Sequence, residues 1–281
     1  MSNRQITLKT LLRRFWKKAL VTWVLVILEG VALLLMPLVI GWAVDDLIQG
    51  ETGGLIQLGA LCLVLLVIGA GRRFYDTRIY AGIYRKVSNE LVSRETARQT
   101  RVSKISARTN LFTEFIEFLE NSLPDIFNQL IGFAGTLGII MFFDLQVLGA
   151  CLVGSVLISA IYLLSQGRML RLNRGQNDEF EKQVDVIVAQ SQPAVKNHFR
   201  RLMRWNIRLS DLETINFSLT WVVLAGVLLF SVYVTATSAS ATFGQVVSII
   251  MYVFGYIESV MAFPLYYQQV IRLHDIASRL G

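Results

Sequence analysis

Two carboxylates stand out because each lies inside an otherwise apolar stretch. Glu29 comes eleven residues after Lys18. Glu258 lies fourteen residues from both Gly244 and Arg272. At about 1.5 Å of rise per residue, both would sit deep within a helix that crosses a membrane. Burial favours the protonated form of a carboxylate, so these groups are candidates for loading and releasing protons. The alternative is structural: each is protonated or hydrogen-bonded to Ser, Thr, Tyr or Trp on a neighbouring helix.

A second acidic group follows at helical spacing. Glu114, Glu117 and Glu120 are each three residues apart, which places them on one stripe of a helix, and Asp125 comes soon after. One interpretation is a solvated face that pairs with an Arg-rich neighbouring helix. The other is an inner vestibule that releases protons or attracts cationic cargo. In that second interpretation, Glu120 and Asp125 join Glu29 and Glu258 as proton-coupling residues.

The helix that carries Glu258 also holds the candidate wall of a cavity. Flexible, aromatic and small side chains share or flank the face of Glu258, a pattern typical of a wide, adaptable binding surface. A stripe of helix packing explains the same pattern. The candidate wall residues are Met251, Tyr252, Gly255 and Ala262.

Other chemistries find little support. The sequence contains no Gly-Lys dipeptide, and therefore no Gly-x-x-x-x-Gly-Lys-[Ser/Thr] loop to cradle a nucleotide phosphate. His198 and His274 are isolated, and we interpret them as surface histidines without metal-ligand spacing. Cys62 and Cys151 lie in different apolar stretches, so no disulfide is expected. We expect no cofactor, no bound metal and no enzymatic activity of this chain.

The elements that position these residues are long apolar helices. Hydrophobic residues make up 54% of the 281, charged residues only 17%, and the mean hydropathy is +0.52. Soluble domains carry roughly 25% charged residues. A membrane-crossing helix needs about 20 apolar residues, and six stretches meet that length when their polar flanks are included. We therefore predict an all-α integral membrane protein with transmembrane helices near 19–44, 55–76, 118–143, 145–167, 214–236 and 243–271.

The basic residues indicate the orientation. All 27 Lys and Arg residues fall in the N-terminal stretch, the two long connections or the C-terminal tail, and the first long connection begins its basic segment at Arg72. The three alternate connections have no basic residue. Because positive residues stay on the cytoplasmic side, we expect a multi-pass protein of the bacterial inner membrane with both termini in the cytoplasm. Topology accounts for the net charge of +7 without nucleic acid.

The flanking segments are predicted to be helical as well. Residues 1–18 read as an amphipathic elbow helix at the membrane surface. The two long connections lack linker composition, so we expect spans two to five to extend into the cytoplasm as paired helices. Short turns would join each pair near 101–108 and 190–197, with Arg101, Lys104 and Arg108 in the first turn and Pro193 breaking the helix in the second.

This arrangement resembles the transmembrane region of the ABC exporter family with the type IV fold. The run Pro37–Gly50, PLVIGWAVDDLIQG, is similar to the Pro…Gly…Asp…Leu…Gly ending of the family's first span. Residues 142–150 resemble its tight turn between spans three and four, and residues 177–199 resemble its second cytoplasmic loop. The resemblance implies that spans one and six line a central cavity and that two copies form a homodimer of twelve helices.

The family's chains usually continue from the sixth span into an ATPase domain, and we expect none here, where residues 19–281 form the membrane domain alone. Two sources of energy then remain open. A separate ATPase subunit could dock under the cytoplasmic turns. An ion gradient could serve instead, as in the SbmA/BacA-type peptide transporters, whose architecture is similar.

We therefore predict a proton-coupled secondary transporter that works by alternating access. An acidic cavity free of Lys and Arg would suit a peptide or another cationic or amphipathic small compound. Membrane lipid, the cargo and a second copy of the chain are the expected partners. The alternatives are the transmembrane subunit of an ATP-driven exporter with a separate ATPase, and a membrane scaffold that transports nothing.

Overall fold

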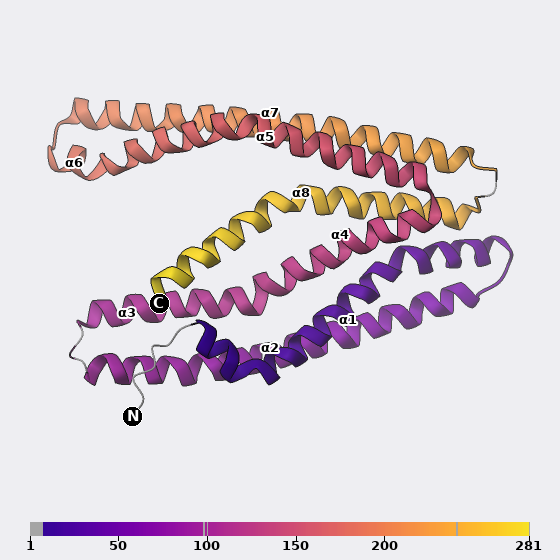
Figure 1. The fold of residues 1–281 in the computed structure, drawn as a ribbon, viewed down its shortest axis with the longest axis horizontal. Coiled ribbons are helices and arrows are strands. Elements are labelled where there is room, and N and C mark those ends of the chain that lie inside the picture. The colour runs from indigo at the N-terminus through magenta and orange to yellow at the C-terminus, as the bar shows by residue number, and fades with distance from the viewer. Residues whose placement is uncertain (1–7, 98, 100, 240, 281) are drawn as a thin grey trace. The chain divides into compact units, whose positions relative to one another are not determined.

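The computed structural model describes residues 8–97, 99, 101–239 and 241–280. For residues 8–15, 17–19, 94, 104, 107, 272 and 274–280 it describes the backbone alone. The described chain is built of helices joined by short turns (Figure 1). The elements are α1 (Leu8–Ile48), α2 (Gly53–Ala97), α3 (Val102–Glu117), the π-helix η1 (Phe118–Ser122), α4 (Leu123–Phe143), α5 (Leu145–Glu181), α6 (Gln183–Val188), α7 (Gln192–Thr237) and α8 (Phe243–Leu280).

Six helical segments of the described residues are long and apolar enough to cross a membrane, which confirms the predicted fold class. Several helices are much longer than the bilayer requires, and the longest are α2 and α7. α2 and α7 have 45 and 46 residues, or about 70 Å each at 1.5 Å per residue, against a hydrocarbon core of about 30 Å. Residues 8–18, predicted as part of a separate elbow helix, are continuous with the first span in α1.

The first of the two long hairpins turns earlier than expected, and the second turns at the start of the expected range. Gln99 and Gln190 have φ values of 53° and 49°, the left-handed conformation in which a helix commonly ends. α3 already begins at Val102, so Arg108 lies inside a helix. Pro193 is the second residue of α7 and does not break a helix there, because proline is tolerated where the backbone N–H has no partner in any case.

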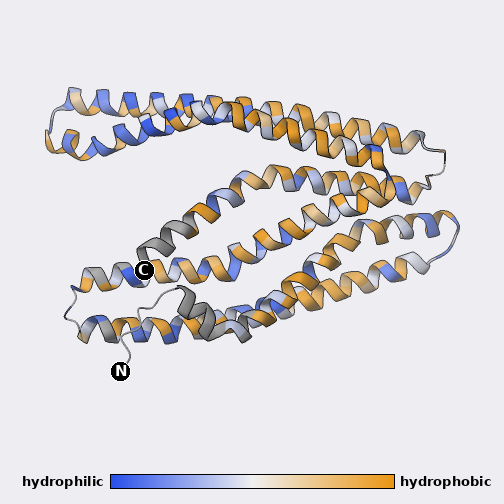
Figure 2. Cartoon of the chain, in the orientation of Figure 1, coloured by the Kyte–Doolittle hydropathy of each residue, from blue (hydrophilic) through white to orange (hydrophobic). Residues whose placement is uncertain are grey.

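The chain divides into two compact units. Unit 1 combines Met1–Phe143 with Ser238–Gly281, and unit 2 is Asp144–Thr237. In unit 1, α1 packs against α2, α4 and α8, and α8 also packs against α3 and α4. Unit 2 is an antiparallel hairpin of α5 and α7 with α6 at its turn. Figure 2 shows that this hairpin is apolar over the half that begins α5 and hydrophilic over the half that carries α6.

Two neighbouring aspartates near the end of α1 cap two other helices of unit 1. Asp45 accepts hydrogen bonds from the backbone N–H of Gly244 (2.7 Å) and the hydroxyl of Thr242 (2.6 Å), at the start of α8. Asp46 accepts one from the backbone N–H of Gly54 (2.6 Å), at the start of α2. The first N–H groups of a helix have no partner within it, and carboxylates there are favoured by the helix dipole. These two acidic residues therefore fasten α2 and α8 to α1.

Close backbone approach and side-chain hydrogen bonds continue this contact along α1 and α8. A Cβ atom at Gly41 would lie 2.5 Å from a backbone oxygen of α8, so only glycine permits the crossing. Farther along, Ser248 and Tyr252 donate hydrogen bonds to the carbonyls of Pro37 and Leu34, both at 2.9 Å. The Pro…Gly…Asp pattern at the end of the first span thus has a packing role.

The π-helix precedes the proline of α4. Pro124 has no N–H and would press its ring against the carbonyl four residues earlier, that of Glu120. The wider π turn over Phe118–Ser122 lies where that clash would occur. It places Glu120 in an irregular segment of an otherwise helical element.

Candidate functional site

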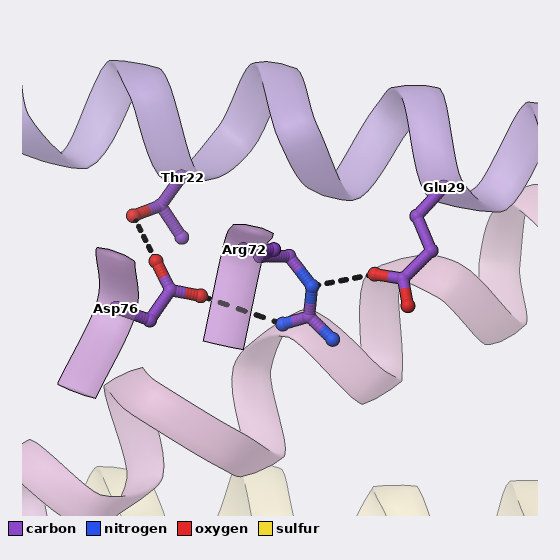
Figure 3. A network of polar contacts seen from close by, with 4 residues as sticks. All are labelled: Thr22, Glu29, Arg72 and Asp76. Atoms are coloured by element: carbon purple, nitrogen blue, oxygen red, sulfur yellow. Dashed lines mark hydrogen bonds and ion pairs between the residues drawn. The ribbon is translucent and has the colours of Figure 1, made fainter. Parts of the chain in front are cut away.

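A cluster of four polar side chains joins α1 to α2 (Figure 3). Arg72 Nε lies 2.5 Å from Glu29 Oε2, and Arg72 Nη1 lies 3.5 Å from Asp76 Oδ2. The hydroxyl of Thr22 donates to Asp76 Oδ1 at 2.6 Å. We call Thr22, Glu29, Arg72 and Asp76 the charge cluster.

Helical spacing brings these side chains together. Thr22 and Glu29 are seven residues apart, which is two turns of α1, and Arg72 and Asp76 are four apart on α2. Gly69, one turn before Arg72, leaves room for the Glu29 carboxylate, because a Cβ there would lie 3.3 Å from Glu29 Oε1. Arg72, Asp76 and Thr22 are 8%, 2% and 1% exposed, so the cluster is shielded within unit 1.

The charges of the cluster do not balance. Among the described side chains, two carboxylates share a single guanidinium, which leaves one negative charge over when both are ionised. A buried charge without a counterion costs several kcal/mol, and proteins meet that cost with a proton or a cation. The cluster can therefore hold either a proton or a monovalent cation in addition to Arg72.

Further charged residues lie along the same region. Asp125 on α4 lies within electrostatic range of Arg72, Arg73 and Glu29. Tyr266 on α8 lies within the same range of both Asp125 and Glu258. Unit 1 thus places the candidate carboxylates of α1, α4 and α8 along one electrostatically connected region.

The predicted proton-coupling residues differ in their surroundings. Glu29 is ion-paired with Arg72, whereas the structural alternative expected a partner among Ser, Thr, Tyr and Trp. Asp125 and Glu258 are exposed in the described chain, on α4 and α8. Glu120 is half-buried in the π-helix, within electrostatic range of Tyr80.

Arg72 and Asp76 are the residues that sequence reasoning missed. From the charge pattern, Arg72 is predicted to be one of the cytoplasmic basic residues, and the cavity is predicted to lack Lys and Arg. In the structure, Arg72 is instead buried and ion-paired with Glu29. The rule for positive residues counts charges in a connection but says nothing about partners. The available signal was the i, i+4 pair of opposite charges directly after an apolar run.

The candidate cavity wall is largely engaged in packing. Tyr252 is 1% exposed, and its hydroxyl donates to the carbonyl of Leu34. Met251, Gly255 and Ala262 are half-buried on the same helix. The packing stripe, given as the alternative interpretation, accounts for Tyr252.

The candidate coupling residues near the first hairpin turn have separate environments. Arg108 lies 2.6 Å from the buried Glu95, a bond that ties α3 to α2. Arg101 is exposed just before α3, and Pro193 is exposed at the start of α7. The side chain of Lys104 lies outside the described residues.

Unit 2 holds a second polar cluster, centred on Glu179 of α5. Its Oε1 atom accepts hydrogen bonds from Arg201 Nε (2.8 Å) and His198 Nδ1 (3.0 Å) of α7, and Lys182 Nζ lies 3.9 Å from Oε2. His198 is fully buried, so its assignment as a surface histidine is wrong: the hairpin encloses it. The side chain of His274 lies outside the described residues.

Glu179 lies fifteen residues beyond Leu164, where the apolar run of α5 ends, and so belongs to the polar extension. Burial favours its neutral form, but the hydrogen bonds from Arg201 and His198 outweigh burial and hold the pKa of the Glu179 carboxyl below its ordinary value of 4.5. Glu179 therefore stays ionised at neutral pH and fastens α5 to α7.

The turn end of unit 2 exposes apolar side chains. Val184 and Val188 are 68% and 73% exposed, and Phe180 and Ile187 are about half exposed. Exposed apolar groups that gather beyond the polar part of a hairpin are typical of a contact surface for another protein.

No group of three or more His, Cys, Asp or Glu side chains in the described part of the chain is placed to hold a metal ion. A family model described as the ABC transporter transmembrane region matches residues 8–244, which is most of the chain. No curated protein sequence matches the chain significantly.

Proposed function

The chain belongs to the ABC transporter transmembrane region family, and from this premise we propose that it is a proton-coupled transporter of a cationic or amphipathic small compound or peptide. Family membership and the six apolar helices make it a multi-pass membrane protein and the membrane domain of a transporter. The energy source and the cargo are the proposed part.

The observation that carries the proposal is the surplus carboxylate of the charge cluster. Arg72 neutralises one of Glu29 and Asp76, and the other must take a proton or a cation. A site that accepts either one, but not both, exchanges cargo for protons. This exchange is the minimum that coupling requires, because the proton and the cargo then bind to the same surplus charge and each lowers the affinity for the other.

The arrangement of the acidic residues along the helices supports a proposed route for protons. Thr22 and Asp76 lie near the predicted cytoplasmic ends of spans one and two, and Glu29 lies about 10 Å deeper along α1 at 1.5 Å per residue. Asp125 and Glu258 extend the acidic region across α4 and α8. We propose that the protein works as a homodimer in the bacterial inner membrane, with both termini in the cytoplasm, and alternates between two access states.

The proposal is tested with purified protein in liposomes of phosphatidylethanolamine and phosphatidylglycerol. Tetraphenylphosphonium serves as a model lipophilic cation, and a pH gradient is imposed without ATP. We expect uptake that a protonophore abolishes, and reduced uptake with altered pH dependence for Glu258→Gln. Protonophore-insensitive uptake would contradict proton coupling, and full activity of Glu258→Gln with unchanged pH dependence would remove Glu258 from the mechanism.

A second candidate function is the membrane subunit of an ATP-driven exporter with a separate ATPase. The exposed apolar residues at the turn of unit 2 favour it, since they offer a contact surface at the end of the long hairpin. In membrane vesicles from the source cells, this function predicts uptake that vanadate abolishes and a protonophore does not. Val184→Asp would lower such uptake. Asp185→Asn, at the exposed polar residue that follows Val184, is the control and should leave uptake unchanged.

A further inference from the structure

We propose that Arg72 is an internal cation that competes with the cargo for Glu29 and thereby selects monovalent organic cations and ejects them. The inference rests on the proposed function, because it assigns a role within the same site. Arg72 is a positioning residue in this scheme, since it acts by releasing and reclaiming Glu29.

The guanidinium lies between two acceptors at different distances. Its Nε atom is 2.5 Å from Glu29, while its Nη1 atom is 3.5 Å from Asp76, beyond the usual range of a strong charge-assisted bond. Figure 3 shows Glu29 and Asp76 on opposite sides of the guanidinium. In the structure, Arg72 therefore favours Glu29 and keeps Asp76 within a short side-chain movement.

Asp76 is prepared to receive Arg72. The hydroxyl of Thr22 holds one oxygen of Asp76 at 2.6 Å, and the other oxygen faces Arg72. Asp76 is 2% exposed, so water does not compete strongly for that oxygen. A guanidinium that leaves Glu29 thus finds a shielded and oriented carboxylate four residues along the same helix.

These positions define an exchange in which every charge is balanced. Without cargo, Arg72 holds Glu29 and a proton neutralises Asp76. A monovalent cation that binds Glu29 moves Arg72 to Asp76, and the Asp76 proton leaves to water. When the proton returns to Asp76, Arg72 goes back to Glu29 and displaces the cargo. An anion or a neutral compound gains nothing at Glu29, which makes a single positive charge the selected property.

The experiment measures equilibrium binding of tetraphenylphosphonium to the purified full-length protein in detergent. Arg72→Gln removes the competitor, so the cation should bind about tenfold or more tightly, while transport in liposomes slows because bound cargo is no longer displaced. Asp76→Asn removes the alternative acceptor and binds Arg72 more firmly to Glu29, so cation affinity should fall about tenfold. The conservative Arg72→Lys should lie between wild type and Arg72→Gln.

Arg78→Gln is the matched control. Arg78 lies on the same helix, is exposed, and donates to the carbonyl of Phe74 of its own helix, so affinity should not change. Equal cation affinity of the wild type, Arg72→Gln and Asp76→Asn would overturn the inference, as would a wild type that does not bind the cation. If Arg72→Gln does not fold, the direction of the Asp76→Asn change decides.

The two proposals fail separately. If the wild type transports the cation with the pH gradient but Arg72→Gln and Asp76→Asn bind it as the wild type does, the role of Arg72 is wrong and proton coupling stands. If the affinities change in opposite directions but a pH gradient drives no uptake, the competition stands and the proposed energy source is wrong.

Discussion

Each unit has a carboxylate bound to an arginine of a neighbouring helix, but the two clusters differ in the ratio of their charges. In unit 1, Glu29 and Asp76 share one arginine inside the predicted membrane spans. In unit 2, Glu179 alone receives Arg201 and His198, with Lys182 close by. Counted over the side chains that the structure describes, the first cluster has a negative charge left over and the second has none.

This difference distinguishes a site that can exchange ligands from a set of ion pairs that only holds two helices together. A carboxylate with more donors than it needs stays ionised and holds its helices together over a wide pH range. Two carboxylates that compete for one donor must take up something else. In this chain, the ratio of carboxylates to cationic partners, more than burial, distinguishes a ligand site from a structural ion pair.

The largest expected effect comes from Glu29→Gln, which removes the surplus charge of the unit 1 cluster. Arg72 and Asp76 then balance each other, so the protein should fold but have no charge to exchange. Uptake of tetraphenylphosphonium driven by a pH gradient should fall to the level of liposomes without protein. Glu51→Gln, an exposed carboxylate in the connection between α1 and α2, is the control and should retain uptake. Wild-type uptake by Glu29→Gln would erase the distinction between the clusters.

The next effect is on stability and concerns unit 2. Glu179→Leu leaves Arg201 and the buried His198 without their common acceptor, and the loss should be about 2 kcal/mol of local stability, as for hydrogen bonds to charged groups. Hydrogen exchange of α5 and α7 around the cluster measures it. Cation affinity should stay at the wild-type value. A change in that affinity without a loss of exchange protection would show that Glu179 is more than a fastening.

A smaller part of the same stabilisation should depend on pH. Because the pKa of folded Glu179 is below 4.5, the ionised carboxylate stabilises the hairpin fully above about pH 4.5 and loses this contribution as the pH falls through the folded pKa. Exchange protection, corrected for the intrinsic rate, should fall in that acidic window for wild type. Glu179→Gln should lack this transition, and an identical transition in Glu179→Gln would assign it to another group.

The smallest effect distinguishes two buried threonines. Thr22→Val removes the hydrogen bond to Asp76 and should lower stability by about 1 kcal/mol in a thermal unfolding assay. Thr220 of α7 is also buried, but its hydroxyl has no hydrogen-bond partner among the described residues, so Thr220→Val should be neutral or stabilising. Equal losses for the two variants would mean that the bond to Asp76 contributes nothing specific.

Much of the fold followed from the sequence because the bilayer imposes a length and a composition on each span. The six apolar stretches correspond to six helices in the structure. Their ends were less predictable, since the turn at Gln99, which precedes the expected range, depends on a backbone conformation with a weak sequence signature. The caps made by Asp45 and Asp46 could not be inferred, because they depend on which helix starts lie beside the end of α1.

The site was predictable in part for the same reason. A carboxylate in an apolar run identifies Glu29 and Glu258 without any knowledge of neighbours. To identify Arg72 as the partner of Glu29, one must know that α1 packs against α2 in a given register, and no local sequence pattern indicates this. His198 illustrates the same limit, since its burial depends on the register between α5 and α7.

The most direct test of the central claim, that one surplus charge takes either a proton or a cation, is a count of protons released on cation binding. Tetraphenylphosphonium is added to the purified protein in weakly buffered detergent solution with a pH indicator, and bound cation is measured in parallel. We expect about one proton to be released per bound cation near neutral pH, and none for Glu29→Gln. Binding by the wild type without proton release would contradict it.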